Sequence, residues 1–468
     1  MKNRRTQLSF IELFESAEPE VENLRGASLV TFPERFVTDV DQFLNYCIAK
    51  PVSLTKSTKT ISRKHLIELN ELLSVKAKYA NPYSPQEFYP YIHFLFQLTL
   101  TSKLLVIGTT GGKDLLRGTK RTEQFKELTF PEKYCSLLEA FWVDMDWERL
   151  NDRSHTAHQY VEVFAKLRHE TPGRPINIVN PQTEIGELLE LETLNWQHFY
   201  KYFEWFGLWT CETDTEKIEN HYRKGAYFVK RIAVTEFGTA IMPVLVFKRN
   251  LYAWNVTTRR KSGEPEWFPG APLEGIPYFE ISNSDNTCIE ENCTEDQSGQ
   301  PFHFPFIPLF PEGTLSNTLP REQKRLREGA YTFEVKYDKG MWRKLKLPGI
   351  GTMDDLHHNI LLAYDFDDDH LYSFFMDGKK WSNNCIVSPH DTFGHPDASK
   401  VRIDSFGFVQ GQQFLYLYDY GDEWTFRVTV EQIDEQNTNN FTPQLVGEKG
   451  DGPEQYFYED WDEDDEDE

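Results

Sequence analysis

The sequence lacks the features of a membrane or secreted protein. Its most apolar run, FLFQLTLTSKLLVIG, is too short for a membrane-spanning helix and is interrupted by Lys103. The first twenty residues contain no apolar signal core. The six cysteines are scattered, and only Cys288 and Cys293 lie close together, with no second Cys or His pair at zinc-ligand spacing. We therefore expect a reduced, cytoplasmic protein with no membrane segment, no bound metal and no cofactor.

Positive charge is also scarce. The chain has 50 Lys and Arg against 74 Asp and Glu, a net charge of −24, and an average field of that sign repels nucleic acid. Nine carboxylates crowd into the last ten residues, EDWDEDDEDE, which predicts a solvated, disordered end. The opposite bias lies in residues 51–126, with 12 Lys and Arg against 5 Asp and Glu. If the protein has an anionic partner such as DNA, residues 51–126 are the segment expected to bind it.

Apolar residues are plentiful enough for several cores. The 468 residues are 39% hydrophobic and 15% aromatic, which predicts a multidomain protein. Two segments repeat one order of elements: an apolar helix, a short strand, a loop, a strand ending in Thr, and a new helix. That order is typical of winged-helix domains, so the sequence predicts mainly α-helical, winged-helix-like modules at 55–150 and 151–250. The first has a hairpin turn signal at Gly111-Gly112, and the second has Thr235 as a helix cap.

Basic side chains lie on or beside the predicted first wing. Lys113, Arg117, Lys120 and Arg121 are the candidate nucleic-acid-binding residues, aimed at phosphates. The alternative is that both modules are scaffolding and these charges form a solvated face. The helix that would read bases, within SPQEFYPYIHFLFQLTLTS, is apolar nearly all round and more typical of a core.

The rest of the chain divides by composition. Nine of the 25 prolines fall between Pro265 and Pro320, among many aromatic residues, which indicates a connector with little regular structure. We therefore expect an N-terminal extension at 1–54, the connector at 251–328, a further domain at 329–436 and an acidic tail at 437–468.

The 329–436 domain is predicted to be α+β, with an antiparallel sheet and hairpins. AYTFEVKYD and MWRKLKL alternate as strands around a Lys339-Gly340 turn. TMDDLHHNILLAY is a helix with Thr352 as its cap and Asp355 completing a capping box. DHLYSFFMDGKKW predicts two short strands joined at Asp377-Gly378.

The segment QFLYLYDYGDEWTFRVTV predicts another hairpin. With Gly421-Asp422 as a two-residue turn and Gly at the positive φ, Asp419 faces Trp424 and lies on the core face with Leu415 and Leu417. A buried carboxylate needs partners, since an unpaired one costs several kcal/mol. We expect a mostly buried Asp419 that is hydrogen-bonded by the Trp424 N–H, by turn amides or by His370.

These motifs resemble the plasmid pRiA4b ORF-3-like family, some of whose members are labelled insertion-element passenger TnpR proteins. The resemblance spans about 105 residues. It rests on YTFEVKYDKGMWRKLKLPGIGTMDDLHHNIL, FDDDHLYSFFMDG and FLYLYDYGDEWTFRVTVEQI, with Lys344 and Phe426 replacing the family's second Arg and its His. The family-motif residues are Trp342, Arg343, Leu356, His357, Asp369, His370, Leu371, Tyr372, Phe374, Asp419, Gly421, Asp422 and Trp424. The resemblance implies an α+β domain without an established activity, and the chain has no resolvase-like serine motif.

Two functions compete. Clustered carboxylates with a histidine could hold Mg²⁺ or Mn²⁺, which would make a metal-dependent nuclease-type enzyme with a site near Asp369, His370 and Asp419. Neighbouring side chains of a strand point to opposite faces, however, so Asp367 and Asp368 are interpreted as a solvated turn. We favour a non-enzymatic binding protein associated with mobile elements or DNA transactions. Its C-terminal domain is expected to bind a protein or peptide partner.

Overall fold

The computed structural model describes most of the chain between residues 32 and 455. The described residues are 32–78, 80–147, 150, 163–164, 167–178, 197–220, 228–261, 269–270, 300–321, 327–382, 384–391, 395–437 and 441–455. The chain divides into an N-terminal unit, Met1–Thr257 with Phe268–Arg321, and a C-terminal unit, Thr258–Trp267 with Glu322–Glu468. Among the described residues, no helix combines the length and the apolar character needed to cross a membrane.

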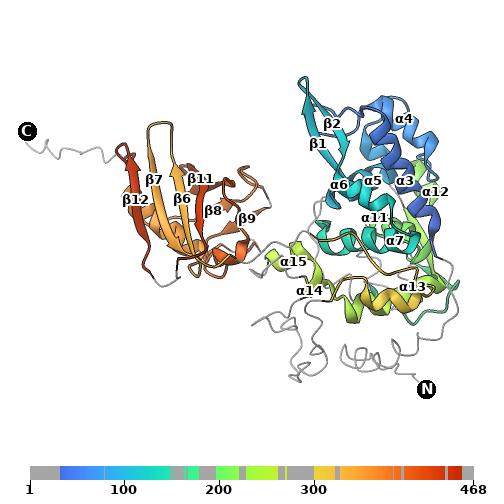
Figure 1. Cartoon of the computed structure of the whole chain (residues 1–468). Coiled ribbons are helices and arrows are strands. Elements are labelled where there is room, and N and C mark those ends of the chain that lie inside the picture. Colours follow the sequence, from blue (N-terminus) through green and yellow to red (C-terminus); the bar gives the residue numbers. More distant parts are fainter. Residues whose placement is uncertain are drawn as a thin grey trace, which may run out of the picture. The chain divides into compact units, whose positions relative to one another are not determined.

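The N-terminal unit consists of helices with two small sheets (Figure 1). Its first part contains α3 (Glu34–Ala49), α4 (Arg63–Leu72), α5 (Pro90–Thr101), β1 (Leu105–Thr110), β2 (Lys113–Gly118), α6 (Lys120–Lys126) and α7 (Phe130–Glu139). Its second part contains β3 (Pro175–Asn177), α11 (Gln197–Trp205), β4 (Trp209–Thr213), α12 (Thr215–Asn220), β5 (Val229–Val234), α13 (Glu236–Pro243), α14 (Leu251–Trp254) and the 3₁₀ helix Phe304–Leu309. Helix α15 (Val256–Lys261) follows α14.

Local signals start several of these helices where the sequence predicts. Thr129 caps α7 in a capping box with Glu132, and the Thr235 hydroxyl accepts from Gly238 N at the start of α13. Ser62 precedes α4 but makes no capping bond, because its hydroxyl pairs with Ser53 instead. Helix α5 begins at Pro90 and is preceded by a 3₁₀ turn at Gln86–Phe88.

In both small sheets the last strand in the chain lies between the other two segments. In the second sheet β5 lies between β3 and β4. In the first, β2 pairs with β1 across Gly111-Gly112, and residues 52–54 run along its other side. Two backbone bonds hold that third segment, from Leu54 N to Asp114 O at 2.9 Å and from Leu116 N to Val52 O at 3.0 Å.

One apolar core fills the N-terminal unit, and its centre is aromatic. Helices α5 and α11, which precede β1 and β4, pack directly on one another. Phe94 stacks on Tyr202 with ring centroids 4.7 Å apart, and Tyr91 meets Trp205 edge-on at 4.8 Å. All four side chains are buried. The apolar faces of the two helices are therefore buried against each other.

The C-terminal unit is an α+β domain with a seven-stranded antiparallel sheet in the order β12-β7-β6-β11-β10-β8-β9 (Figure 1). The strands are β6 (Ala330–Lys336), β7 (Trp342–Pro348), β8 (Tyr372–Phe375), β9 (Cys385–Val387), β10 (Gln413–Tyr418), β11 (Trp424–Asp434) and β12 (Gln444–Lys449). Helix α16 (Met353–Tyr364) packs on one face. Alternate residues of β6, β7, β10 and β11 meet it there, among them Phe333, Phe414 and Phe426. Strand β12 lies within 437–468, which the sequence assigned to the acidic tail.

Two predicted turns in this unit differ from the structure. The loop between β10 and β11 spans residues 419–423, so Tyr418 faces Trp424 and Leu417 faces Thr425. Leu415 and Leu417 therefore lie on the opposite face from Phe426, and positive φ falls at Asp419 and Glu423 rather than at Gly421. The chain does turn at Gly378 (φ 71°), but the strand pairing with β8 starts only at Cys385.

Candidate functional site

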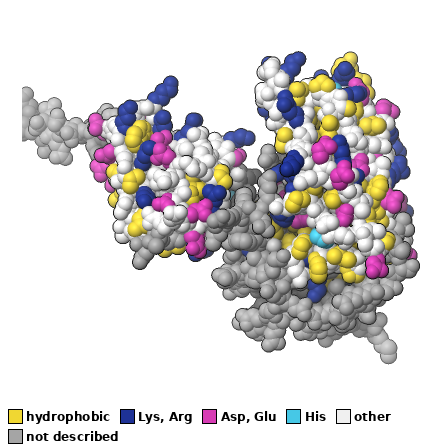
Figure 2. Space-filling view, in the orientation of Figure 1, with side chains coloured by type: hydrophobic (Ala, Val, Ile, Leu, Met, Phe, Trp, Pro, Cys, Tyr) yellow, Lys and Arg dark blue, Asp and Glu magenta, His cyan; other side chains and the backbone are white. Residues whose placement is uncertain are grey.

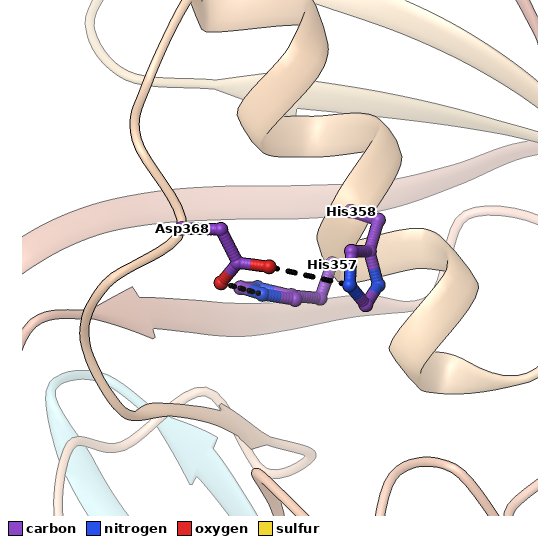
Figure 3. A group of neighbouring side chains, drawn as sticks. All are labelled: His357, His358 and Asp368. Atoms are coloured by element: carbon purple, nitrogen blue, oxygen red, sulfur yellow. Dashed lines mark hydrogen bonds and ion pairs between the residues drawn. The ribbon is translucent and has the colours of Figure 1, made fainter.

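Three side chains of the C-terminal unit converge at one end of α16. His357 and His358 lie in the second turn of the helix, and Asp368 lies in the segment between α16 and β8 (Figure 3). The Thr352 hydroxyl accepts from Asp355 N, and the Asp355 carboxylate accepts from Thr352 N at 2.7 Å. This capping box sets where the helix begins, so His357 faces the core and its neighbour lies at the rim. We name His357, His358 and Asp368 the HHD cluster.

The chain reverses after α16 to bring Asp368 back to the histidines. Asp365 ends the helix in the left-handed conformation, with φ 58°. Phe366 is then buried against Tyr364, Trp424 and Phe426, which anchors the returning segment. Asp368 Oδ1 lies 3.0 Å from His357 Nε2, and its Oδ2 lies 3.2 Å from His358 Nε2.

His357 is held rigidly. Its side chain is 1% exposed, and its ring stacks on Tyr372 with centroids 3.6 Å apart and planes at 10°. Its Nδ1 is 2.7 Å from the hydroxyl of Tyr416, which is also buried. Burial lowers the pKa of His357 to about 4, although Asp368 acts in the opposite direction. The ring is therefore neutral near pH 7.

His358 is more accessible, at 52% exposed, and Asp368 is 46% exposed. The His358 Nδ1–H donates to the Asp354 carbonyl at 2.8 Å, which orients the ring so that its Nε2 faces Asp368. The Asp354 carboxylate in turn accepts from the Tyr372 hydroxyl. Tyr372, which stacks on His357, is thus hydrogen-bonded to Asp354, the residue that orients His358.

A second polar group lies beside the HHD cluster. The Tyr418 hydroxyl accepts from Asp369 N at 3.0 Å and His370 N at 3.3 Å, and it donates to the Asp367 carbonyl. Burial raises the pKa of Tyr418 to about 12, so the phenol keeps its hydrogen. His370 Nε2 is 3.6 Å from Asp369 Oδ1 and 3.5 Å from Asp419 Oδ2. These separations are those of ion pairs formed when His370 is protonated.

Asp419 is buried and has partners, as the sequence predicts. It is 8% exposed, and its Oδ1 accepts from Gly421 N at 2.8 Å. A turn amide and His370 are therefore the partners. The Trp424 indole N–H is not one, because it is buried with no hydrogen-bond partner. Asp422 lies exposed in the same loop.

The other family-motif residues build the sheet. The Arg343 guanidinium donates to the carbonyls of Ala363 and Gly450, at 2.8 and 2.9 Å, which ties β7 to the end of α16 and to the segment after β12. Leu356 and Phe374 are core residues, whereas Trp342 and Leu371 are partly exposed. Lys344, which replaces an Arg of the family pattern, pairs with Glu431.

The predicted nucleic-acid-binding residues fall on the β1–β2 hairpin and α6. Lys113, Arg117 and Lys120 are exposed, and Figure 2 shows Lys and Arg side chains around this hairpin. Arg117 contacts the Thr110 hydroxyl across the hairpin. Arg121 is partly buried and donates to the carbonyls of Ser102, at 3.0 Å, and Pro320. The Arg121 guanidinium is therefore engaged with the backbone of its own unit.

The sequence missed part of the HHD cluster. His357 was found as a motif residue, whereas His358 was not singled out and Asp368 was interpreted as a solvated turn. The available signal was a His-His pair at positions 5 and 6 of a capped helix, eleven and ten residues before Asp368. Among the described residues, these three form the group of His, Cys, Asp and Glu side chains whose ligand atoms all lie within 4.8 Å.

Comparisons with known proteins identify the C-terminal unit. The α+β domain defined by this sheet and helix matches a known family: residues 332–457 carry a plasmid pRiA4b ORF-3-like domain. The match includes β12, and its description names no activity. The chain is also similar to the crystal structure of a protein of unknown function, MM3350, from Methanosarcina mazei Go1, with 25% sequence identity. The match covers 26% of this chain and 69% of that chain, with a TM-score of 0.22. No curated protein matches the chain.

Proposed function

We propose that the protein is a non-enzymatic binding protein whose N-terminal unit holds duplex DNA by its phosphates. The observation that carries the proposal is the basic surface of the β1–β2 hairpin and the start of α6, where Lys113, Arg117 and Lys120 are all exposed. Among the described residues, neither Lys113 nor Lys120 has an ion-pair partner. Cations without carboxylate partners are available to replace the counterions of a phosphate backbone.

The arrangement around the hairpin supports a winged-helix-like interpretation. Residues 52–54 lie between α3 and α4, and β1 and β2 follow α5; together they form a three-stranded set whose hairpin stands where a wing would be. In the second sheet β3 precedes α11, β4 and β5 follow it, and β5 again lies between the other two strands. In the first module the helices begin at Glu34, so the proposed module extends beyond 55–150 at its N-terminal side.

Base reading is not part of the proposal. In a winged-helix protein the helix before the wing enters the major groove. Here that helix is α5, and eight of its twelve residues are buried, with Tyr91 and Phe94 packed against α11. Exposing this face would cost about 1.5–3 kcal/mol for each large apolar side chain. The hairpin cations would therefore bind DNA of any sequence. Binding of a protein or peptide by the C-terminal unit stays a prediction.

The test is binding of a fluorescent 20-base-pair duplex, measured by anisotropy between 50 and 200 mM salt. The variant combines Lys113→Gln, Arg117→Gln and Lys120→Gln. We expect weaker binding at every salt concentration and a slope of log K against log salt shallower by about 2–3, since each lost phosphate contact removes about 0.9.

The matched control combines Lys379→Gln, Lys400→Gln and Arg427→Gln, three exposed cations of the C-terminal unit. It changes the net charge equally and should keep the wild-type slope. Wild-type protein that fails to bind at 50 mM salt, or a hairpin variant with an unchanged slope, would refute the proposal.

A further inference from the structure

We infer that the HHD cluster is a binding site for one divalent transition-metal ion, for which zinc is the probe. Two histidines and one carboxylate supply three ligand atoms, the set that leaves further coordination positions open in catalytic zinc and non-haem iron sites. Their ligand atoms lie within 4.8 Å of one another, a separation that an ion at about 2.0–2.2 Å from each can bridge. This inference is independent of DNA binding.

The ring nitrogens are arranged as in a metal site. Both histidines direct Nε2 at Asp368, and Nδ1 of each has a partner behind it, the Tyr416 hydroxyl for one and the Asp354 carbonyl for the other. Metal-ligating histidines almost always donate their second N–H to such a group, which fixes the ring and the tautomer. With an ion on Nε2, the His357 Nδ1–H would donate to the Tyr416 oxygen.

One ligand of the HHD cluster, His357, is fixed in the core, and the other two are accessible to solvent. His357 is buried and stacked on Tyr372, so its ring is already held in place and needs no reorientation to bind an ion. His358 and Asp368 are about half exposed, which gives an ion a path from solvent and room for bound water. Among the described residues, no Lys or Arg pairs with Asp368, whose partners are the two histidines themselves.

The neighbouring Asp354 carboxylate supports the histidines and is not one of the three proposed ligands. Asp354 binds the Tyr372 hydroxyl through Oδ1, and its Oδ2 is 3.8 Å from His358 Nδ1. Without an ion, the same atoms form a hydrogen-bonded chain from Tyr416 through His357 to Asp368. If the cluster is only an ion pair or a hydrogen-bonded chain, it should show no saturable zinc binding. Saturable zinc binding therefore distinguishes a metal site from a purely structural cluster.

The experiment is a zinc titration of the full-length, untagged chain in competition with a chromophoric chelator. We expect one zinc ion per chain, and affinity at least tenfold weaker in Asp368→Asn and in His358→Gln. Both residues are half exposed, so neither change should prevent folding, which circular dichroism will verify. Zinc should also raise the melting temperature of the wild type and not of the two variants.

Two control variants are matched in chemistry. Asp367→Asn changes the adjacent carboxylate, and His390→Gln removes an exposed histidine outside the cluster; both should bind zinc as the wild type does. Tyr416→Phe tests the positioning role of the phenol and should weaken zinc binding about 10- to 100-fold. No saturable binding in the wild type, or equal affinity in Asp368→Asn, His358→Gln and the controls, would overturn the inference.

Discussion

At the scale of single residues, Asp419 shows how one carboxylate can hold a loop. It begins the connection between β10 and β11 with φ 52°, a conformation that Asp tolerates better than most residues. Its Oδ1 accepts from Gly421 N, and its Oδ2 is directed at His370. The same side chain therefore fixes the turn and links it to the segment that carries Asp368.

We expect Asp419→Ala to lower the free energy of unfolding of the C-terminal unit by about 1–3 kcal/mol, since it removes the acceptor of a loop amide and places Ala at positive φ. Asp419→Asn should cost much less, because the amide oxygen can still accept from Gly421. The exposed Asp422→Ala is the control and should change stability little. Calorimetry of the full chain measures all three, and a wild-type melting profile for Asp419→Ala would disprove this role.

At the scale of elements, one buried amide joins three parts of the N-terminal unit. The Gln86 Oε1 accepts from Ile61 N at 2.6 Å, so its Nε2 faces His93 Nδ1 at 2.9 Å. An amide nitrogen only donates, hence His93 must accept and must be unprotonated at Nδ1. Burial lowers the pKa of His93 to about 4, in agreement with this geometry.

This bond predicts how stability depends on pH. Because the pKa of His93 is about 4 in the folded chain and about 6.5 unfolded, only the unfolded state gains a proton as pH falls between these values. The contribution of neutral His93 to the free energy of unfolding is complete above about pH 6.5. It decreases by up to about 3 kcal/mol as pH falls to 4.

The His93→Asn variant keeps an acceptor near Nδ1 and cannot titrate. Urea unfolding between pH 4 and 7.5 should therefore show a flatter profile than the wild type. His390→Asn, an exposed histidine of the C-terminal unit, should keep the wild-type slope. A His93→Asn profile as steep as the wild type would show that another group causes the loss.

Elements defined by local chemistry were predictable, and those defined by packing were not. Thr352 and Asp355 mark the start of α16, and Lys339-Gly340 marks the turn between β6 and β7, because caps and turns depend on neighbouring residues. The β10–β11 register was wrong because a five-residue loop with positive φ at Asp419 and Glu423 replaced the expected two-residue turn. The HHD cluster was missed in part because the left-handed Asp365, which returns the chain to the histidines, has no strong sequence signal.

At the scale of the whole molecule, each half of the chain combines a buried framework with a small accessible site. In the N-terminal unit, α5 and α11 bury the faces that a groove-reading helix would expose, and the basic hairpin stays outside. In the C-terminal unit, which carries the plasmid pRiA4b ORF-3-like domain, the sheet buries His357 and leaves His358 and Asp368 at the rim. The mutual burial of Phe94 and Tyr202 could not be inferred from either helix alone, since each is simply apolar.

The central claim is that the N-terminal unit holds DNA through phosphates and reads no bases. The most direct measurement compares the anisotropy of two 20-base-pair duplexes with the same length and base composition but unrelated sequences, across the same salt series. We predict equal affinities within a factor of about two and equal salt slopes, because phosphate contacts carry no sequence information. An affinity for one duplex at least 100-fold higher, at equal salt, would show that bases are read and would contradict the account.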